Sequence, residues 1–383
     1  MNITSKLPTV GTTIFTVMSQ LAQAHDAINL SQGFPDFATP PQLVELVEKY
    51  MRAGHNQYPP MTGVPFLREQ IAAKMQLHYG VTTDMDSEIT VTSGATEALF
   101  VAIMATVGPG NEAIVLDPCY DAYEPAITLA GGLTRHIPLG PGFKPDWQAV
   151  ADAVTDRTRL IVVNSPHNPS GSVFSAADLD ALADIIADTR ILLLSDEVYE
   201  HMVYDDARHL SLLTHPELRA RCFVVSSFGK TYHATGWKVA YCIAPTEMTT
   251  EFRKIHQFVT FTTHTPSQWA LAEFMASVPA HYQELPGFYQ AKRDLFLAEM
   301  AGSRFVMTPT KGTYFQLADY SAISSMPDTE FARFLTTEVG VAAIPISVFY
   351  ETVPIARVVR FCFCKSDDTL RQAAAKLRLL EHA

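Results

Sequence analysis

The chain has 383 residues, of which 48% are hydrophobic and 18% are charged, which excludes a disordered protein and favours a large folded domain with a smaller partner. Its 28 Lys and Arg residues against 40 Asp and Glu residues give a net charge of −12, so we expect no broad contact with nucleic acid. No apolar run reaches the ~18 residues of a membrane-spanning helix, and the N-terminus lacks the apolar stretch of a signal peptide. We therefore expect a cytoplasmic protein with no membrane partner.

Cysteine and histidine spacing gives no sign of a metal site. The five cysteines form no CxxC pair, and the 13 histidines are scattered without an HxxxH motif. Cys362 and Cys364 would point to the same face of one strand, which suits a mutual disulfide poorly. We expect buried, reduced thiols and no metal.

From about residue 89 to about residue 245, short apolar strands alternate with longer helical patterns. The expected strands are EITVTSG (88–94), EAIVLDP (112–118), RLIVVNSP (159–166), RILLLSDE (190–197), RCFVVSSFG (221–229) and WKVAYCIAP (237–245). Helical spacing is clear at 95–107 and at 175–189, where Ser175 and Asp178 suit a capping box. This alternation predicts an α/β fold whose mostly parallel sheet lies between helices.

The pattern changes after about residue 280. A long helix over 267–300 is expected to be interrupted near Pro279 or Pro286, and short strands follow around 312–320, 341–347 and 358–364. The stretch 366–383 has helical spacing and an acidic start. We therefore predict a large domain over residues 31–280 and a smaller α+β domain from residues 1–30 and 281–383.

Ligands of open α/β sheets bind at the carboxyl ends of the strands, so the residues that follow each strand matter most. The first strand leads into Ser93-Gly94-Ala95-Thr96, a turn of small residues opening a helix. Free backbone N–H groups there would hold a phosphate, although small residues also open many ordinary helices.

The other strand ends each deliver a polar or aromatic group. Tyr120 follows the second strand, and Asn168 follows the third in a turn with two X-Pro bonds, where a cis peptide is plausible. The fourth strand ends at Asp196 with Tyr199 three residues later, and the fifth leads to Lys230. Each group alone also fits ordinary packing or a solvated loop. Together they predict a planar, phosphorylated ligand with a ring nitrogen and a carbonyl. Pyridoxal 5′-phosphate has all of these features.

The stretches SPHNPSG, SDEVYE, SSFGKTYHATGWKVAY and RFCF, in this order and spacing, resemble the class I aminotransferases, which are fold-type I pyridoxal-phosphate enzymes. The N-terminal stretches NLSQGFPDF (29–37) and NQYPPMTGVPFLRE (56–69) resemble the branch that holds the bacterial methionine aminotransferases and the kynurenine/glutamine transaminases. The resemblance covers nearly the whole chain.

The resemblance implies a role for each matching residue. Lys230 would carry the cofactor as a Schiff base and later move the proton. Asp196 would pair with the ring nitrogen, and Tyr199 and Asn168 would bond the ring 3-oxygen. Tyr120 would stack on the ring, and the phosphate would be held by Gly94, Ala95, Thr96, Ser227 and Lys238. Lys238 stands where many relatives have arginine.

The resemblance also implies a substrate site and a partner. Arg360 would bind the substrate α-carboxylate with help from the Gly33 backbone and the Asn168 amide. Phe15, Phe261 and Phe349 match the side-chain pocket, although some of these phenylalanines are also explained by core packing. Tyr58 would reach the cofactor of a neighbouring subunit, which implies a homodimer with shared active sites.

The predicted reaction is transfer of the amino group of methionine, or of an aromatic or large apolar amino acid, to a 2-oxo acid. A PLP-dependent β-lyase acting on cysteine conjugates, or another reaction of this fold such as ring closure or acyl transfer, remains an alternative. A non-catalytic PLP-binding regulatory protein is a second one. A nucleotide-binding dehydrogenase is disfavoured because no GxGxxG follows the first strand.

Overall fold

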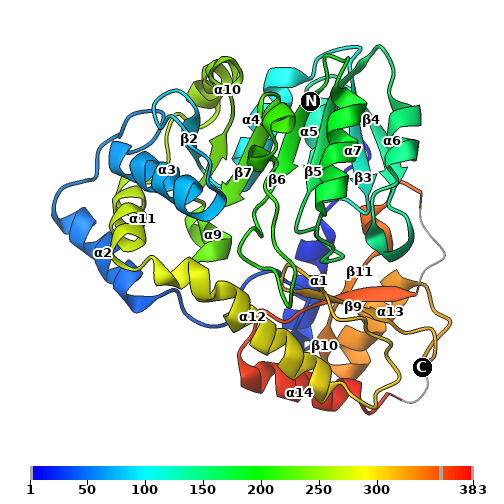
Figure 1. Cartoon of the computed structure of the whole chain (residues 1–383). Helices are drawn as coiled ribbons and strands as arrows, with labels where there is room; N and C mark the ends of the chain where they lie inside the picture. The colour runs from blue at the N-terminus through cyan, green and yellow to red at the C-terminus, as the bar shows by residue number, and fades with distance from the viewer. Residues whose placement is uncertain (1–2, 353–356, 381–383) are drawn as a thin grey trace.

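The computed structural model describes residues 3–352 and 357–380 and has two parts, arranged one above the other in Figure 1. The upper part holds a seven-stranded sheet in the order β2-β8-β7-β6-β5-β3-β4. Its strands are β2 (Ile89–Thr92), β3 (Glu112–Asp117), β4 (Leu133–Pro138), β5 (Thr158–Asn164), β6 (Leu192–Asp196), β7 (Cys222–Ser227) and β8 (Ala240–Ile243).

The sheet is mixed. The strands from β7 to β4 all pair in parallel, whereas β8 pairs antiparallel with both β7 and β2. Ser227 at the end of β7 is therefore opposite Ala240 at the start of β8, which in turn is opposite Thr92 at the end of β2. One edge of the sheet thus gathers the ends of the parallel strands, the end of β2 and the start of β8.

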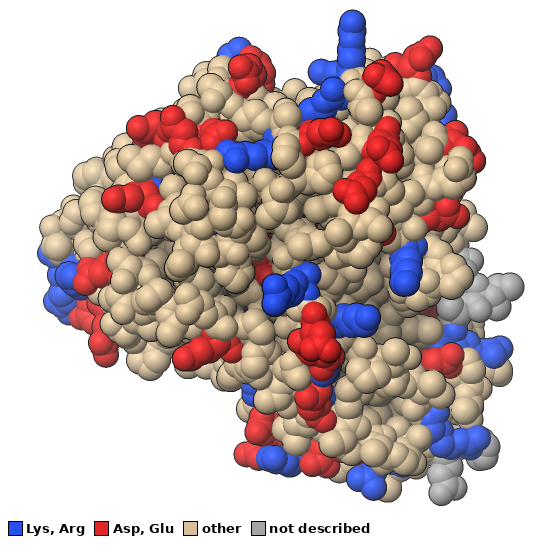
Figure 2. Space-filling view, viewed as in Figure 1, with Lys and Arg blue, Asp and Glu red and all other residues tan. Residues whose placement is uncertain are grey.

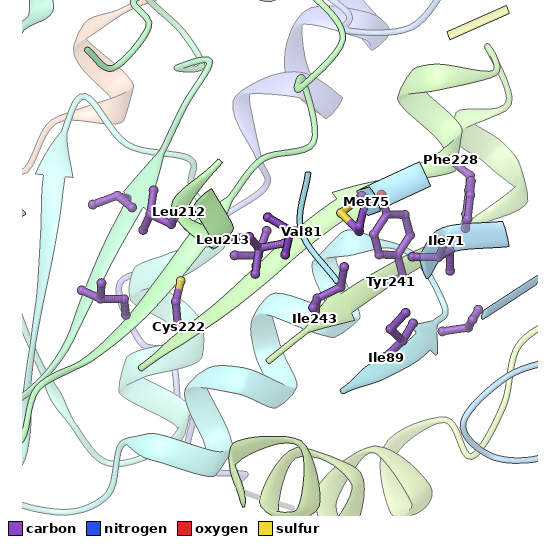
Figure 3. Packing of buried hydrophobic residues seen from close by; sticks show 14 of the residues in the cluster. Ile71, Met75, Val81, Ile89, Leu212, Leu213, Cys222, Phe228, Tyr241 and Ile243 are labelled. Atoms are coloured by element: carbon purple, nitrogen blue, oxygen red, sulfur yellow. The ribbon is translucent and has the colours of Figure 1, made fainter. Parts of the chain in front are cut away.

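Helices cover both faces of the sheet because successive strand residues point to opposite sides. On one face, Ile161, Leu193 and Ile243 belong to one apolar cluster that also includes residues of α3 (Pro65–Tyr79) and α11 (Thr265–Ser277). Figure 3 shows Ile71 and Met75 of α3 near Tyr241 and Ile243 of β8. On the other face the cluster includes Leu160 and Leu194. The helices of this part are α2 (Pro41–Arg52), α3 (Pro65–Tyr79), α4 (Ala95–Thr106), α5 (Tyr123–Leu129), α6 (Trp147–Ala153), α7 (Ala176–Ile186), α8 (Pro216–Arg219), α9 (Phe228–Thr231), α10 (Thr246–Val259) and α11 (Thr265–Ser277).

The lower part has its own apolar core. This core joins Met18 and Leu30 near the N-terminus to Phe296, Phe361 and Leu377 near the C-terminus. Its elements are α1 (Ile14–Ala24), β1 (Ile28–Asn29), α12 (Ala280–Glu299), β9 (Phe315–Asp319), α13 (Asp328–Phe334), β10 (Val341–Ala342), β11 (Ile344–Pro345), β12 (Val358–Cys362) and α14 (Asp367–Leu377). β1 pairs in parallel with β10, and β11, β12 and β9 form an antiparallel sheet.

Most of the expected elements are present, with instructive differences. The long helix divides at Val278 and Pro279, whereas Pro286 lies inside α12. Strand β4 was not expected, because its side chains alternate between exposed and half-buried positions at the sheet edge. The expected strand over 237–245 begins only at Ala240, since Thr235–Trp237 form a short 3₁₀ turn and Lys238 is left-handed.

Local sequence signals account for several helix ends. Ser175 and Asp178 form the expected capping box at the start of α7. The C-terminal helix begins after Ser366 as expected and ends at Leu377, while residues 381–383 of its predicted range lie outside the described residues. All five cysteines are buried and free.

Within residues 3–352 and 357–380, no helix combines the length and apolar character needed to cross a bilayer. On the face drawn in Figure 2, Lys and Arg side chains are scattered among Asp and Glu and form no continuous basic patch.

Candidate active site

A cavity of about 320 Å³ lies where the strand ends of the upper part meet the lower part. It is lined by Phe15, Gln32, Gly33, Gly94, Ala95, Thr96, Leu99, Tyr120, Asn164, Asn168, Asp196, Val198, Tyr199, Ser227, Gly229, Lys230, Thr235, Lys238, Val239, Phe315 and Arg360. The cavity therefore brings together residues that the sequence places at five separate strand ends.

One end of the cavity has the features of an anion site. Helix α4 begins at Ala95, after Gly94 with φ of 86°, and its first-turn N–H groups have no partner within the helix. Lys238, itself left-handed at φ 53°, approaches Gly94 so closely that a Cβ there would lie 3.0 Å from the Lys238 Nζ. The left-handed φ of Gly94 favours glycine, a Cβ would displace the Lys238 amine, and positive charge and helix dipole act together at this end.

Asp196 ends β6 deep in the cavity, with 4% of its surface exposed. Burial raises the pKa of its carboxyl group to about 6. The Tyr123 hydroxyl donates to Oδ2 at 2.7 Å and the Val198 N–H donates to Oδ1 at 3.3 Å, and both bonds favour the ionised form. The neighbouring Glu197 accepts hydrogen bonds from Ser195, Leu212 and His209 instead.

Lys230 lies in the short helix α9, which follows β7. Its Nζ donates to the Gly33 carbonyl at 3.1 Å and to the Tyr314 hydroxyl at 2.9 Å. Burial lowers the pKa of this amine to about 8. Roughly a tenth of the amine is therefore neutral at pH 7, whereas a lysine with the ordinary pKa of 10.5 would be almost wholly charged, and this neutral fraction can act as a nucleophile or proton carrier.

Arg360 lies on β12 and projects into the cavity with 1% exposure. Its Nη1 donates to Asn168 Oδ1 at 2.7 Å and its Nη2 donates to the Ser31 carbonyl at 3.1 Å. The Phe315 ring stacks 3.8 Å from the guanidinium carbon. Its Nε is buried without a hydrogen-bond partner in the described part of the chain, which leaves a donor for an incoming carboxylate.

Aromatic rings form other walls. Tyr120 and Tyr199 line the cavity, and burial raises the pKa of both hydroxyls. Phe15 lines it from α1 and packs on Phe349, whose ring lies 5.8 Å away. Phe349 is buried behind Phe15, with its ring centroid 5.7 Å from the Arg360 guanidinium carbon.

Tyr58 and Phe261 do not line the cavity of their own chain. They form an edge-to-face pair at 5.5 Å with exposures of 82% and 42%. Their predicted roles in cofactor and substrate binding therefore depend on a second subunit and stay predictions.

Sequence reasoning missed several cavity residues. Asn164 ends β5 and bonds both the Asp196 carbonyl and the Asn168 N–H; its polar side chain at a strand end was the available signal. Tyr123 and Tyr314 hydrogen-bond cavity residues without lining the cavity themselves. They have no such signal, because they lie on a helix and in the lower part. Gln32 and Phe315 were likewise not predicted. Both predicted X-Pro bonds near Asn168 are cis, as is Asp117-Pro118.

The donor set fits pyridoxal 5′-phosphate. The Gly94–Lys238 cradle and the α4 N-terminus suit a phosphate, the buried Asp196 carboxylate suits a protonated ring nitrogen, and the amine of Lys230 suits an aldehyde. The residues of all three groups line one cavity of suitable size.

Comparison with known proteins points the same way. The family model for aminotransferase class I and II matches residues 25–377. A methionine aminotransferase from Escherichia coli is 52% identical over 98% of both chains, and a kynurenine–oxoglutarate transaminase from Dictyostelium discoideum is 34% identical over 97% of this chain and 94% of its own. A crystal structure of a methionine aminotransferase from Escherichia coli superposes with a TM-score of 0.97 at 52% identity, covering 99% of this chain and 100% of the other.

Proposed function

Because the chain belongs to the class I and II aminotransferase family, we propose that it transfers the amino group of methionine, or of a similarly large apolar or aromatic amino acid such as kynurenine, to a 2-oxo acid. The fold is that of the fold-type I enzymes, and members of this family use pyridoxal 5′-phosphate. The donor assignment is supported by the Escherichia coli and Dictyostelium discoideum relatives.

One observation carries the proposal. An amine with a lowered pKa, a buried carboxylate and a buried guanidinium, from Lys230, Asp196 and Arg360, all line one cavity. Removal of the α-proton of an amino acid needs a base near that carbon, a clamp on its carboxylate and an electron-withdrawing group. Lys230 can serve as the base and Arg360 as the clamp, while Asp196 would keep the electron-withdrawing ring of the cofactor protonated.

Bound pyridoxal 5′-phosphate supplies an aldehyde that accepts the amino group and a protonated ring that withdraws electrons. Its phosphate would be held by Gly94, Ala95, Thr96, Ser227 and Lys238. Asp196 would hold a proton on the ring nitrogen, Tyr120 would lie against the ring, and Tyr199 and Asn168 would bond its 3-oxygen.

The remaining steps belong to the protein. Lys230 accepts the α-proton at Nζ, because its lowered pKa of about 8 makes the neutral amine far more accessible than in an ordinary lysine. Arg360 binds the α-carboxylate through guanidinium N–H groups, including the unpartnered Nε, and Asn168 keeps the guanidinium in place. The Phe315 ring restricts the same guanidinium from one face.

The substrate side chain would lie beside Phe15, with Phe349 behind it. Among the described residues that line the cavity, Arg360 is the one arginine. The site therefore suits an apolar side chain better than the second carboxylate of aspartate.

The chain is further proposed to form a homodimer with shared sites. The exposed pair of Tyr58 and Phe261, with Phe258 at 87% exposure close by in sequence, supports an apolar contact at this surface. The domain division at residues 31–280 against 1–30 and 281–383 is supported by largely separate apolar cores, although Val198, Tyr199, Met202 and Tyr204 of the large domain belong to the core of the lower part. A cytoplasmic location suits the five buried free thiols.

An amino-donor screen tests the proposed function. Methionine, phenylalanine and kynurenine should turn over with higher kcat/KM than aspartate, and only when a 2-oxo acid is present. Turnover of a cysteine conjugate without any 2-oxo acid would instead favour the β-lyase, and cofactor binding without turnover of any donor would favour a regulatory protein. A clear preference for aspartate would contradict the substrate assignment.

A further inference from the structure

Tyr314 immediately precedes β9, and its side chain reaches the catalytic lysine from the lower part of the molecule. Its hydroxyl lies 2.9 Å from Lys230 Nζ and 2.5 Å from the Gly33 carbonyl oxygen, while Lys230 Nζ lies 3.1 Å from the same carbonyl. The three groups therefore form a closed triangle of hydrogen bonds between segments far apart in the sequence.

The hydrogen positions in this triangle follow from which of the three groups can donate a hydrogen bond and which can only accept one. A tyrosine hydroxyl has one hydrogen and two lone pairs, whereas a carbonyl only accepts. The Tyr314 hydroxyl donates to Gly33, so it receives the Lys230 amine through a lone pair. Burial raises the pKa of Tyr314 well above its ordinary value, so the hydroxyl keeps its hydrogen. The Lys230 amine thus has two hydrogen-bond acceptors, the Tyr314 hydroxyl oxygen and the Gly33 carbonyl oxygen.

The triangle is held rigidly by its neighbours. The Tyr314 ring packs edge-on against Tyr199, with centroids 5.2 Å apart, and against Phe315 at 4.9 Å. Gly33 is fitted to this packing, since a Cβ there would lie 2.9 Å from Phe315 Cζ and 3.4 Å from Tyr314 Cε2. A side chain at position 33 would therefore force the carbonyl away from the amine.

We propose that Tyr314 is a positioning residue of the transamination reaction: together with the Gly33 carbonyl, it binds the side-chain amine of Lys230 whenever that amine is not covalently engaged. The inference rests on the proposed function, in which Lys230 carries the α-proton. An amine on a long flexible side chain transfers a proton efficiently only when it is held near the reacting carbon. Two fixed acceptors supply that restraint.

The same contacts affect the charge of the amine. Burial lowers its pKa, with Arg360 acting in the same direction, whereas Cys364, Cys362 and Asp196 favour the charged form. The two acceptors also favour the ammonium form, because a charged donor makes stronger hydrogen bonds to them than a neutral amine does. Removal of the Tyr314 hydroxyl should therefore lower the pKa of Lys230 further.

Tyr314→Phe tests the proposal, with Tyr320→Phe as the matched control. Tyr320 is also fully buried, and its hydroxyl bonds the Met326 carbonyl at 2.8 Å without lining the cavity. In protein stripped of cofactor, acetylation of Lys230 by acetic anhydride is followed against pH by peptide mass spectrometry. The midpoint for Tyr314→Phe should shift to lower pH, and that for Tyr320→Phe should not move.

In the cofactor-loaded enzyme, Tyr314→Phe should lower kcat about tenfold to a hundredfold with KM for methionine changed less than about threefold. Gly33→Ala displaces the other acceptor and should shift the acetylation midpoint in the same direction, which keeps the test open if Tyr314→Phe folds poorly. An unshifted midpoint with wild-type kcat in Tyr314→Phe, or equal effects in Tyr320→Phe, would overturn the proposal. An inactive wild-type enzyme would instead overturn the proposed function, and an inactive Lys230→Ala beside a normal Tyr314→Phe would overturn this inference alone.

Discussion

Tyr123 and Asp196 are joined by a 2.7 Å hydrogen bond, and at most 4% of either residue is exposed. Burial raises the pKa of the Asp196 carboxyl to about 6, and the Tyr123 hydroxyl acts against that rise. A tyrosine on α5 therefore helps to keep ionised the carboxylate that the proposed reaction needs.

Tyr123→Phe should make Asp196 harder to ionise. A hydrogen bond to a charged group contributes about 1.5–3 kcal/mol, so its loss should raise the pKa of Asp196 by about one unit or more. The acidic limb of the kcat/KM profile for methionine should move to higher pH by that amount. Tyr320→Phe, remote from the cavity, should leave the limb in place, and an unmoved limb in Tyr123→Phe would contradict this role.

Cofactor retention should depend on pH through Asp196. The folded-state pKa of about 6 lies above the ordinary value of 3.8, so the carboxylate is half ionised near pH 6 and largely ionised at neutral pH. Its attraction for a protonated ring nitrogen is present at neutral pH and is lost as pH falls through 6. Dialysis against buffers from pH 8 to pH 5 should therefore release cofactor from the wild type with a midpoint near that pKa.

Asp196→Asn is the control for this measurement. It should retain less cofactor at neutral pH and should lose the transition near pH 6. An equal transition in Asp196→Asn and the wild type would assign the pH dependence to another group.

Arg360→Lys should weaken the binding of every amino donor. Lysine keeps the charge but cannot present two parallel N–H groups, and it forfeits the stacking on Phe315. Steady-state kinetics should show KM for methionine raised about tenfold to a hundredfold. Arg52→Lys changes an exposed arginine paired with Glu48 and should leave KM unchanged. A normal KM in Arg360→Lys would contradict the proposal that this residue binds the substrate carboxylate.

Shared active sites would allow two inactive chains to complement each other. If Tyr58 acts in the neighbouring subunit, a mixture of Tyr58→Ala and Lys230→Ala chains contains hybrids with one intact site. After unfolding and refolding together at equal amounts, activity should rise above both parents, toward about a quarter of the wild type. Mixing Lys230→Ala with the double variant should restore nothing. No gain in the first mixture would contradict sharing.

Much of this site was predictable because parallel strands end at one edge of a sheet. Thr96, Asn168 and Lys230 follow strands, Asp196 ends one, and all four line the cavity. Lys238 also arrives there, since β8 runs antiparallel and begins where its neighbours end.

Other features of the fold and the site could not be predicted from the position of strand ends. Tyr314 comes from the lower part, and its hydroxyl bonds Lys230 only because the two parts pack together. Strand β4 has the alternation of an exposed sheet edge and so lacks a continuous apolar run. Tyr58 and Phe261 face outward, and one chain alone leaves their function a prediction.

The most direct test of the account is to locate the bond between cofactor and protein. The enzyme loaded with pyridoxal 5′-phosphate is treated with borohydride, which fixes an imine irreversibly, and is then digested for mass spectrometry. We expect the added phosphopyridoxyl mass on the peptide that contains Lys230, together with complete loss of transaminase activity. A label on Lys238 or another lysine, or an enzyme that stays active after reduction, would contradict the central claim.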